Sequence, residues 1–314
     1  MNIIKNRYLY FLISLLVIIP GLVFMGLNWS KTKIGPLPLG IDFRGGSLLE
    51  VQFDGELPSP TDIAELYAQF STPEEPIQEP IVQPLGADAY SIRSKTMSDA
   101  TKGAIVTEME SRFGSKVTVL NFTSVSASVG AEVTIAAGYA ILLAALAIIV
   151  YIWWAFRTVE HAYRYGAAAI FAMLHDVLVV LGAEAILGYV LGWEADALFL
   201  TALLTVIGFS VHDTIVVFDR VRENSRIYRR VEYETMVNHS IIQSLDRSIN
   251  TQLTVMFTLF ALVLFGGASI RHFVLILLVG ILSGTYSSIF NAAPILVVWE
   301  NREWTKWFRR NPAA

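Results

Sequence analysis

Six long apolar segments set the architecture of this 314-residue chain. A helix of about 20 apolar residues crosses the roughly 30 Å hydrocarbon core of a bilayer. The composition agrees, because 54% of the residues are hydrophobic and only 16% are charged, more apolar than in a soluble domain. We therefore predict an α-helical polytopic membrane protein with six transmembrane helices. The predicted spans are residues 8–27, 135–156, 165–190, 197–218, 245–265 and 273–299.

The first apolar segment follows Lys5 and Arg7, a pattern that signal peptides share. Its apolar run is longer than the roughly 7–15 residues of a signal peptide. No A-x-A cleavage site follows it. We expect an uncleaved membrane anchor.

Lysine and arginine are distributed unevenly among the loops, and this bias orients membrane proteins. The loop at 192–196 has neither residue, and the loop at 266–272 has only Arg271. Basic residues cluster at both termini, between the second and third spans, and between the fourth and fifth. Both termini are therefore expected in the cytoplasm. The predicted domains are an anchor (1–28), an extracytoplasmic domain (29–130), a five-helix transmembrane bundle (131–300) and a cytoplasmic tail (301–314).

Residues 29–130 form the only large polar region, and their hydrophobic periodicity differs from that of the spans. Alternation predicts strands at 48–53, 79–84, 89–95 and 117–125. Ser59 and Ser98 are each placed to cap a helix, and Gly114 is placed to end the second one. The order β-α-β-β-α-β is that of a ferredoxin-like α+β domain. Since we find no catalytic cluster in it, we interpret it as a binding or positioning module.

A Gly45-Gly46 pair leads from the first span into this domain. Glycines permit tight backbone turns. The segment lacks a Walker lysine and a G-x-G-x-x-G spacing, so a phosphate cradle is not expected. A turn before a strand is the simpler interpretation.

One carboxylate, Asp213, lies inside the predicted fourth span. A charge near the middle of such a helix costs roughly 2.5–3.5 kcal/mol on insertion scales, and such acids usually mark ion or proton pathways. Asp213 lies about 24 Å from Ala197 along the helix, and Arg247 lies about one turn inside the next span. A carboxyl group that moved between a guanidinium and apolar surroundings would release and bind protons. A static ion pair that fixes helix packing is the alternative.

The third span contains a second polar pair, His175 and Asp176, about 15 Å from its cytoplasmic end. With Asp213 it suggests a polar seam through the bundle. His212 points about 100° away from Asp213 around the helix, and is either a second relay group or a packing residue. Glu184 either extends the seam or is explained by packing or interfacial solvation. No third ligand accompanies these groups, so neither a metal nor a cofactor is expected.

Two further features are structural. Gly280 and Gly284 form a G-x-x-x-G pattern that allows close helix packing in a membrane. Residues 220–234 are rich in Arg and Glu and predict an interfacial or cytoplasmic helix. A solvated charged face is the default for such a helix, and contact with acidic lipid or a partner is the alternative.

Five segments in a fixed order carry a family resemblance. They are Gly-Ile-Asp-Phe-Arg-Gly-Gly at 40–46, Leu-His-Asp-Val at 174–177, the segment 213–224, Leu-Asp-Arg-Ser-Ile-Asn-Thr at 245–251 and Gly-Thr-Tyr-Ser-Ser-Ile at 284–289. Over nearly its whole length the chain resembles the SecF family, the smaller subunits of the SecD–SecF accessory complex of protein translocation. One departure is visible, because His212 stands where an Asn commonly precedes the Asp.

The resemblance implies a place in the RND superfamily and in the bacterial plasma (inner) membrane. It implies a SecD partner with a second set of six helices, docking to the SecYEG channel and often association with YajC. The proton-motive force would then help to pull or release unfolded secretory polypeptide, with Asp213 and Arg247 on the proton pathway. No nucleic-acid partner is implied, and no enzyme is expected because no nucleophile–base pair or phosphate loop is present.

Two other functions stay open. An RND-type proton-coupled small-molecule transporter subunit would share the membrane acids, but such transporters are usually longer chains with twelve helices. A non-transducing scaffold would only stabilise the translocon. That scaffold predicts that Asp213→Asn leaves export intact.

Overall fold

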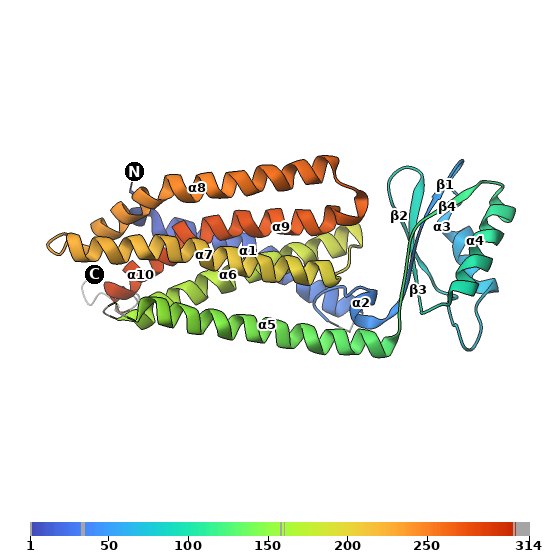
Figure 1. Cartoon of the computed structure of the whole chain (residues 1–314), viewed down its shortest axis with the longest axis horizontal. Coiled ribbons are helices and arrows are strands. Elements are labelled where there is room, and N and C mark those ends of the chain that lie inside the picture. The colour runs from blue at the N-terminus through green and yellow to red at the C-terminus, as the bar shows by residue number, and fades with distance from the viewer. Residues whose placement is uncertain (1, 33–34, 158, 160, 304, 306–314) are drawn as a thin grey trace, which may run out of the picture. The chain divides into compact units, whose positions relative to one another are not determined.

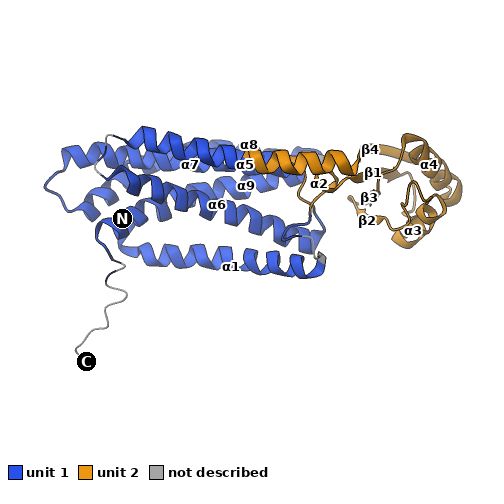
Figure 2. Ribbon diagram, turned by 90° about the horizontal axis from the view of Figure 1, so that it is seen from below, with its two compact units in different colours: residues 1–38, 141–193, 198–314 blue, residues 39–140, 194–197 orange. Residues whose placement is uncertain are grey.

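The computed structural model describes residues 2–32, 35–157, 159, 161–303 and 305 (Figure 1). It divides into two compact units (Figure 2). Unit 1 comprises Met1–Pro38, Ile141–Trp193 and Leu198–Ala314, and unit 2 comprises Leu39–Ala140 and Glu194–Ala197. Unit 1 is a helix bundle, and unit 2 contains the sheet.

Six helical spans in the described ranges are long and apolar enough to cross a membrane. This confirms the predicted architecture, and every helix extends beyond its predicted span at one end or both. The first five spans are α1 (Arg7–Thr32), α5 (Ala127–Phe156), α6 (Ala162–Leu191), α7 (Ala197–Ile227) and α8 (Tyr233–Phe265), and the short 3-10 helix η1 (Ile4–Asn6) precedes α1. The sixth consists of α9 (Ala268–Ser287), the π-helical turn η2 (Ser288–Ala292) and α10 (Ala293–Glu300).

The π-helical turn has a local cause in Pro294, the second residue of α10. Proline has no N–H, and its ring crowds the carbonyl group four residues earlier, here that of Phe290. One widened turn accommodates this crowding within a continuous span. The turn begins at Ser288, next to the polar residues of α9 described below.

Residues 220–234 do not form the separate helix that their charge predicts. Instead, α7 continues to Ile227 and α8 begins at Tyr233. Neither Gly nor Pro interrupts the helix after Phe218. Ion pairs three residues apart, Arg220–Glu223 and Arg222–Asp219, stabilise these surface turns.

Burial separates the spans into inner and peripheral helices. The most apolar stretches of α6, α7 and the sixth span are 44%, 50% and 56% buried, against 11%, 6% and 17% for α1, α5 and α8. Polar groups on the three inner spans therefore have protein neighbours. The peripheral helices present large apolar side chains outward, such as Leu142 and Trp153 of α5.

The inner helices α7 and α9 approach closely where α9 has glycines. A Cβ atom on Gly280 would lie 2.1 Å from Cγ2 of Val206, and one on Gly284 would lie 3.3 Å from Cα of Ser210. Small residues allow this kind of contact between membrane helices. The approach brings polar side chains of α9 within reach of α6 and α7.

Unit 2 contains the predicted ferredoxin-like domain. Its elements are α2 (Ile41–Arg44), β1 (Gly46–Phe53), α3 (Pro60–Gln69), β2 (Ile81–Pro84), β3 (Ala89–Ser94), α4 (Asp99–Phe113) and β4 (Val117–Val125). The antiparallel sheet has the order β2-β3-β1-β4. The helix ends follow from the sequence, because Ser59 and Ser98 accept hydrogen bonds from Asp62 N and Thr101 N, each at 3.2 Å. The core is formed by residues of β1, α3, β3 and α4, including Leu49, Val51, Ile63, Leu66, Ile92, Ile105 and Met109.

The Gly45-Gly46 segment adopts a backbone that favours glycine, with φ of 77° and 131°. A Cβ atom on Gly45 would lie 2.7 Å from Cα of Ala127. The same segment bonds to residues 194–197 within unit 2. Gly40 N donates to Ala195 O at 2.7 Å, and Ala197 N donates to the Asp42 carboxylate at 2.9 Å. Asp42 thereby caps the first turn of α7.

Candidate functional site

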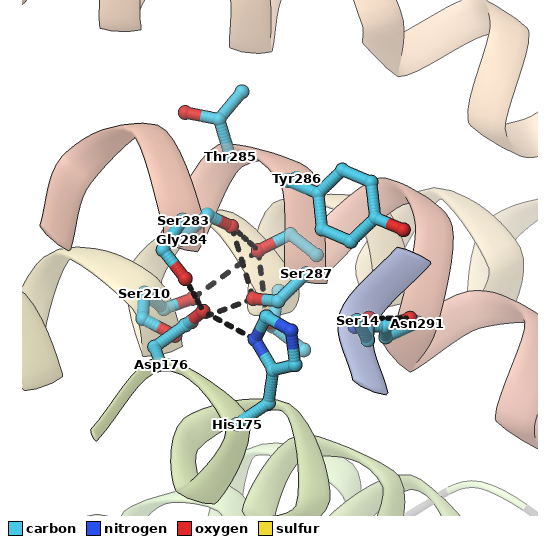
Figure 3. A network of polar contacts seen from close by, with 12 residues as sticks. Ser14, His175, Asp176, Ser210, Ser283, Gly284, Thr285, Tyr286, Ser287 and Asn291 are labelled. Carbon is cyan, nitrogen blue, oxygen red and sulfur yellow. Dashed lines mark hydrogen bonds and ion pairs between the residues drawn. The ribbon is translucent and has the colours of Figure 1, made fainter. Parts of the chain in front are cut away.

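The Asp176 carboxylate of α6 is 1% exposed and lies among serine hydroxyl groups of two other helices, α7 and α9 (Figure 3). Ser210 Oγ of α7 donates to Oδ2 at 2.5 Å. From α9, Ser283 and Ser287 donate to Oδ1 and Oδ2 at 2.6 Å each. His175 Nδ1 lies 2.9 Å from Oδ1. These hydrogen bonds satisfy both oxygens of the buried carboxylate.

The serines reach Asp176 because of their positions on α9. Ser283 and Ser287 are four residues apart, so they lie on one face of the helix. Ser288, the first residue of η2, donates to Gly284 O at 2.8 Å and lies 3.0 Å from Thr214 Oγ1 of α7. The polar contacts therefore join α6, α7 and α9.

The His175 ring stacks on Tyr286 of α9, with centroids 6.0 Å apart (Figure 3). Tyr286 in turn donates to Tyr10 O of α1 at 2.6 Å. The buried Nε2 of His175 has no hydrogen-bond partner among the described residues. One ring nitrogen of His175 thus faces Asp176, and the other makes no hydrogen bond within the described ranges.

Asp213 lies three residues after Ser210, on the same face of α7. It is 3% exposed, and its carboxylate accepts a hydrogen bond from Gln252 Nε2 of α8. The His212 side chain is exposed, so the two neighbours point to different surroundings. The structure brings Asp213 and Asp176 into one buried region and leaves His212 outside it.

Arg247 does not face Asp213, although their similar predicted depths in the membrane suggested that the two side chains could pair. Its side chain is exposed, and no contact with the Asp213 carboxylate is present among the described residues. Arg247 lines a cavity of about 360 Å³ between α7 and α8, together with Asp219, Glu223 and Ser244. The physical reason is helix phase, because five residues at about 100° each place Arg247 and Gln252 on different faces.

Buried polar side chains continue along α8 from Gln252. Ser240, Ser244, Ser248 and Gln252 are spaced four residues apart and are all less than 6% exposed. Ser248 Oγ and Gln252 Oε1 have no hydrogen-bond partner in the described part of the chain. This polar face leads from Asp213 to the cavity that Ser244 and Arg247 line.

Glu184 has a partner that the sequence did not reveal. It is fully buried on α6, and its Oε2 lies 2.7 Å from His272 Nε2 of α9. The His272 ring packs on Trp193, with centroids 4.8 Å apart. Glu184 Oε1 is buried without a partner within the described ranges. The buried Glu184 carboxylate thus has a specific polar contact, with His272, in addition to its packing.

Fold and site together define a multi-pass membrane protein with carboxyl groups buried between its helices and a small α+β domain. The family model described as "Protein export membrane protein SecD/SecF, C-terminal" matches residues 105–302, and the "SecD/SecF GG Motif" matches residues 34–56. The chain belongs to the SecF family of the SecD/SecF protein export membrane proteins. This confirms the resemblance seen in the sequence.

Relatives named protein translocase subunit SecF match the chain over its whole length. The relative from Anaerolinea thermophila is 53% identical over 312 residues, covering 99% of this chain and 97% of its own. The relative from Thermobaculum terrenum is 48% identical, covering 98% of this chain and 97% of its own.

Two crystal structures of SecDF share the fold. One is a translocon-associated membrane protein from Thermus thermophilus, with a TM-score of 0.78 and 29% identity. The alignment covers 96% of this chain and 39% of the SecDF chain. SecDF in a super-membrane-facing form has a TM-score of 0.60 and 25% identity, covering 98% of this chain and 40% of that chain. The chain thus spans less than half the length of SecDF.

Proposed function

We propose that this chain is a SecF subunit that works with a SecD partner in Sec protein export. The complex uses the proton-motive force to assist late translocation of polypeptides through the SecYEG channel. The observation that supports this function best is the Asp213 carboxyl group, which is buried in the bundle and bonded to the neutral side chain of Gln252. Acids buried in membrane helices usually belong to ion or proton pathways.

The proton route would follow the buried polar groups of the inner helices. It begins at Glu184 and His272 and continues along α6 to Asp176, which bonds to Ser210. Glu184 and Asp176 are eight residues or about 12 Å apart along the helix, so water or a helix movement would bridge them. Ser210 and Asp213 are neighbours on α7, and the polar face of α8 then leads to the Arg247 cavity.

Arg247 has a role in this proposal although it does not face Asp213. A rearrangement of α8 against α7 would bring the guanidinium to the carboxylate and favour its ionised form. The proton would then leave toward the cavity that Arg247 lines. The bond from Gln252 to Asp213 belongs to the other state of this cycle. His175 contributes its free ring nitrogen, and His212 stays outside the buried route.

The topology follows the positive-inside rule. Both termini and the arginine-rich loop between α7 and α8 lie in the cytoplasm, and the ferredoxin-like domain lies on the outer side, where it meets the emerging polypeptide. The peripheral helices α1, α5 and α8 expose apolar side chains along the bundle. Lipid and the helices of SecD would cover them, and YajC is a further partner.

Export of a secreted reporter tests this function. Asp213→Asn should block the late stage of export while the protein still accumulates in the membrane. Asp246→Asn is the matched control, because Asp246 is an exposed acid on the neighbouring helix α8 and does not line the Arg247 cavity. Normal export by Asp213→Asn would favour the scaffold function instead.

A further inference from the structure

An arginine-lined cavity of about 580 Å³ lies at the end of the bundle where α6 begins. Its lining includes Arg164 of α6, Arg222 and Arg226 near the end of α7, Arg229 in the loop that follows, and Tyr233 at the start of α8. Glu300 at the end of α10 is its only carboxylate among the described residues. Segments distant in the sequence thus converge on one basic cavity.

Among the described residues, basic side chains outnumber acidic ones in the lining of this cavity. Glu300 pairs with Arg164, so this carboxylate already has a partner. Arg222 pairs with Asp219, whose side chain does not line the cavity. Arg226 and Arg229 have no acidic partner in the part of the chain that the structure describes. An anion entering the cavity would therefore meet two available guanidinium groups.

Among the anions that could enter the cavity, a phosphate group matches the hydrogen-bonding geometry of arginine best. The planar guanidinium offers parallel N–H donors that match two phosphate oxygens, and a charge-assisted pair of this kind is stronger than a neutral hydrogen bond. The hydroxyl groups of Ser225 and Tyr233 also line the cavity and can donate to further oxygens. Binding pockets for small ligands commonly have volumes of about 300–1,000 Å³.

The surroundings of the cavity favour a lipid as the source of the phosphate. Arg222 Nη1 lies 3.5 Å from Ala155 O, which connects the cavity to the last turn of α5. Trp153 and Trp154 in that turn are 66% and 55% exposed, and exposed tryptophans are typical of the membrane–water interface. Basic pockets between membrane helices bind anionic lipid head groups.

We propose that this cavity binds the phosphate group of an anionic phospholipid. A free phosphate ion shares the same chemistry, and the position of the cavity beside the interfacial tryptophans favours the lipid. The site is separate from the buried acids, so it does not depend on proton coupling.

Lipid binding to the full chain in a neutral detergent tests the proposal by native mass spectrometry. The three ligands are phosphatidylglycerol, phosphatidylcholine and inorganic phosphate. Phosphatidylglycerol should bind more tightly than phosphatidylcholine. The double variant Arg226→Gln/Arg229→Gln should weaken this binding by at least about tenfold, since it removes two charge-assisted contacts.

Arg220→Gln/Arg230→Gln is the matched control, because it removes the same charge from the same region but leaves the cavity intact. It should bind phosphatidylglycerol like the unmodified chain. If the glutamine variant does not fold, Arg226→Lys/Arg229→Lys replaces it and should still bind more weakly than the control. Equal losses in the cavity variant and the control would overturn the proposal. Equal affinity for the two lipids, or binding of inorganic phosphate alone, would also overturn it.

Discussion

Ser210 of α7 donates a hydrogen bond to Asp176 of α6, with an Oγ–Oδ2 distance of 2.5 Å. Asp213 lies one turn further along α7 on the same face. The two buried carboxyl groups therefore belong to one polar system, and a movement of α7 against α6 would change both. The hydroxyl groups of Ser210, Ser283 and Ser287 around Asp176, called here the hydroxyl cage, are therefore part of the proposed proton route.

The hydroxyl cage should stabilise the bundle. Ser287→Ala removes one donor to the buried Asp176 carboxylate, so we expect the free energy of unfolding to fall by about 1 kcal/mol. Thr254→Ala is the control, because this exposed hydroxyl bonds only to the backbone of its own helix. Unfolding of both variants in mixed micelles measures the difference. Equal stability of the two variants would argue against the cage.

Close packing of α7 and α9 predicts a strong effect at Gly280. Because its added Cβ would lie 2.1 Å from Val206, Gly280→Ala should destabilise the bundle by about 1–3 kcal/mol. Gly208→Ala on α7 is the control, since no atom lies within 4 Å of its added Cβ. The unfolding midpoint of each variant in detergent tests this. Val206→Ala should restore part of the loss in the Gly280→Ala background, and a loss that persists in full would contradict the contact.

Glu194, in the loop between α6 and α7, should make the stability of the folded chain depend on pH. Burial raises the pKa of the Glu194 carboxyl above its ordinary value of 4.5, although Arg93, at 3.2 Å, opposes the shift. Between 4.5 and the raised pKa the folded chain holds a proton that the unfolded chain has lost. Stability therefore falls as the pH rises through this window and is regained as the pH is lowered.

Glu194→Gln should remove this contribution. Thermal unfolding over a pH series should show the unmodified chain gaining stability relative to this variant as the pH falls toward 4.5. Glu56→Gln, at an exposed acid of the same unit, is the control and should leave the slope unchanged. Parallel pH profiles for the unmodified chain and Glu194→Gln would contradict the prediction.

Local signals made much of the fold predictable. The caps at Ser59 and Ser98 act within one helical turn, and hydropathy finds long spans from composition alone. The strand predicted at 117–125 coincides with β4. The charged end of α7 was mistaken for a separate helix because a hydropathy pattern records where a helix leaves the apolar region, not where its hydrogen bonds end.

The buried acids were also predictable, because a charge in an apolar helix is conspicuous. Their partners were not. The rise per residue gives the depth of Arg247 but not which helix faces Asp213, and that depends on packing between α7 and α8. Ser287 lies in a segment that carries the family resemblance, but nothing in the sequence predicted that serines bond to Asp176. A membrane helix tolerates serine wherever its hydroxyl can bond to the preceding turn. His272 lies outside the predicted spans, so Glu184 had no visible partner.

Proton flux through the reconstituted complex tests the role of Asp213 most directly. The chain and its SecD partner are placed in liposomes that contain a pH-sensitive dye, and a proton gradient is imposed. The unmodified complex and the Asp246→Asn control should both dissipate the gradient. Asp213→Asn should reduce the flux to the level of protein-free liposomes, and flux equal to that of the unmodified complex would contradict proton coupling through Asp213.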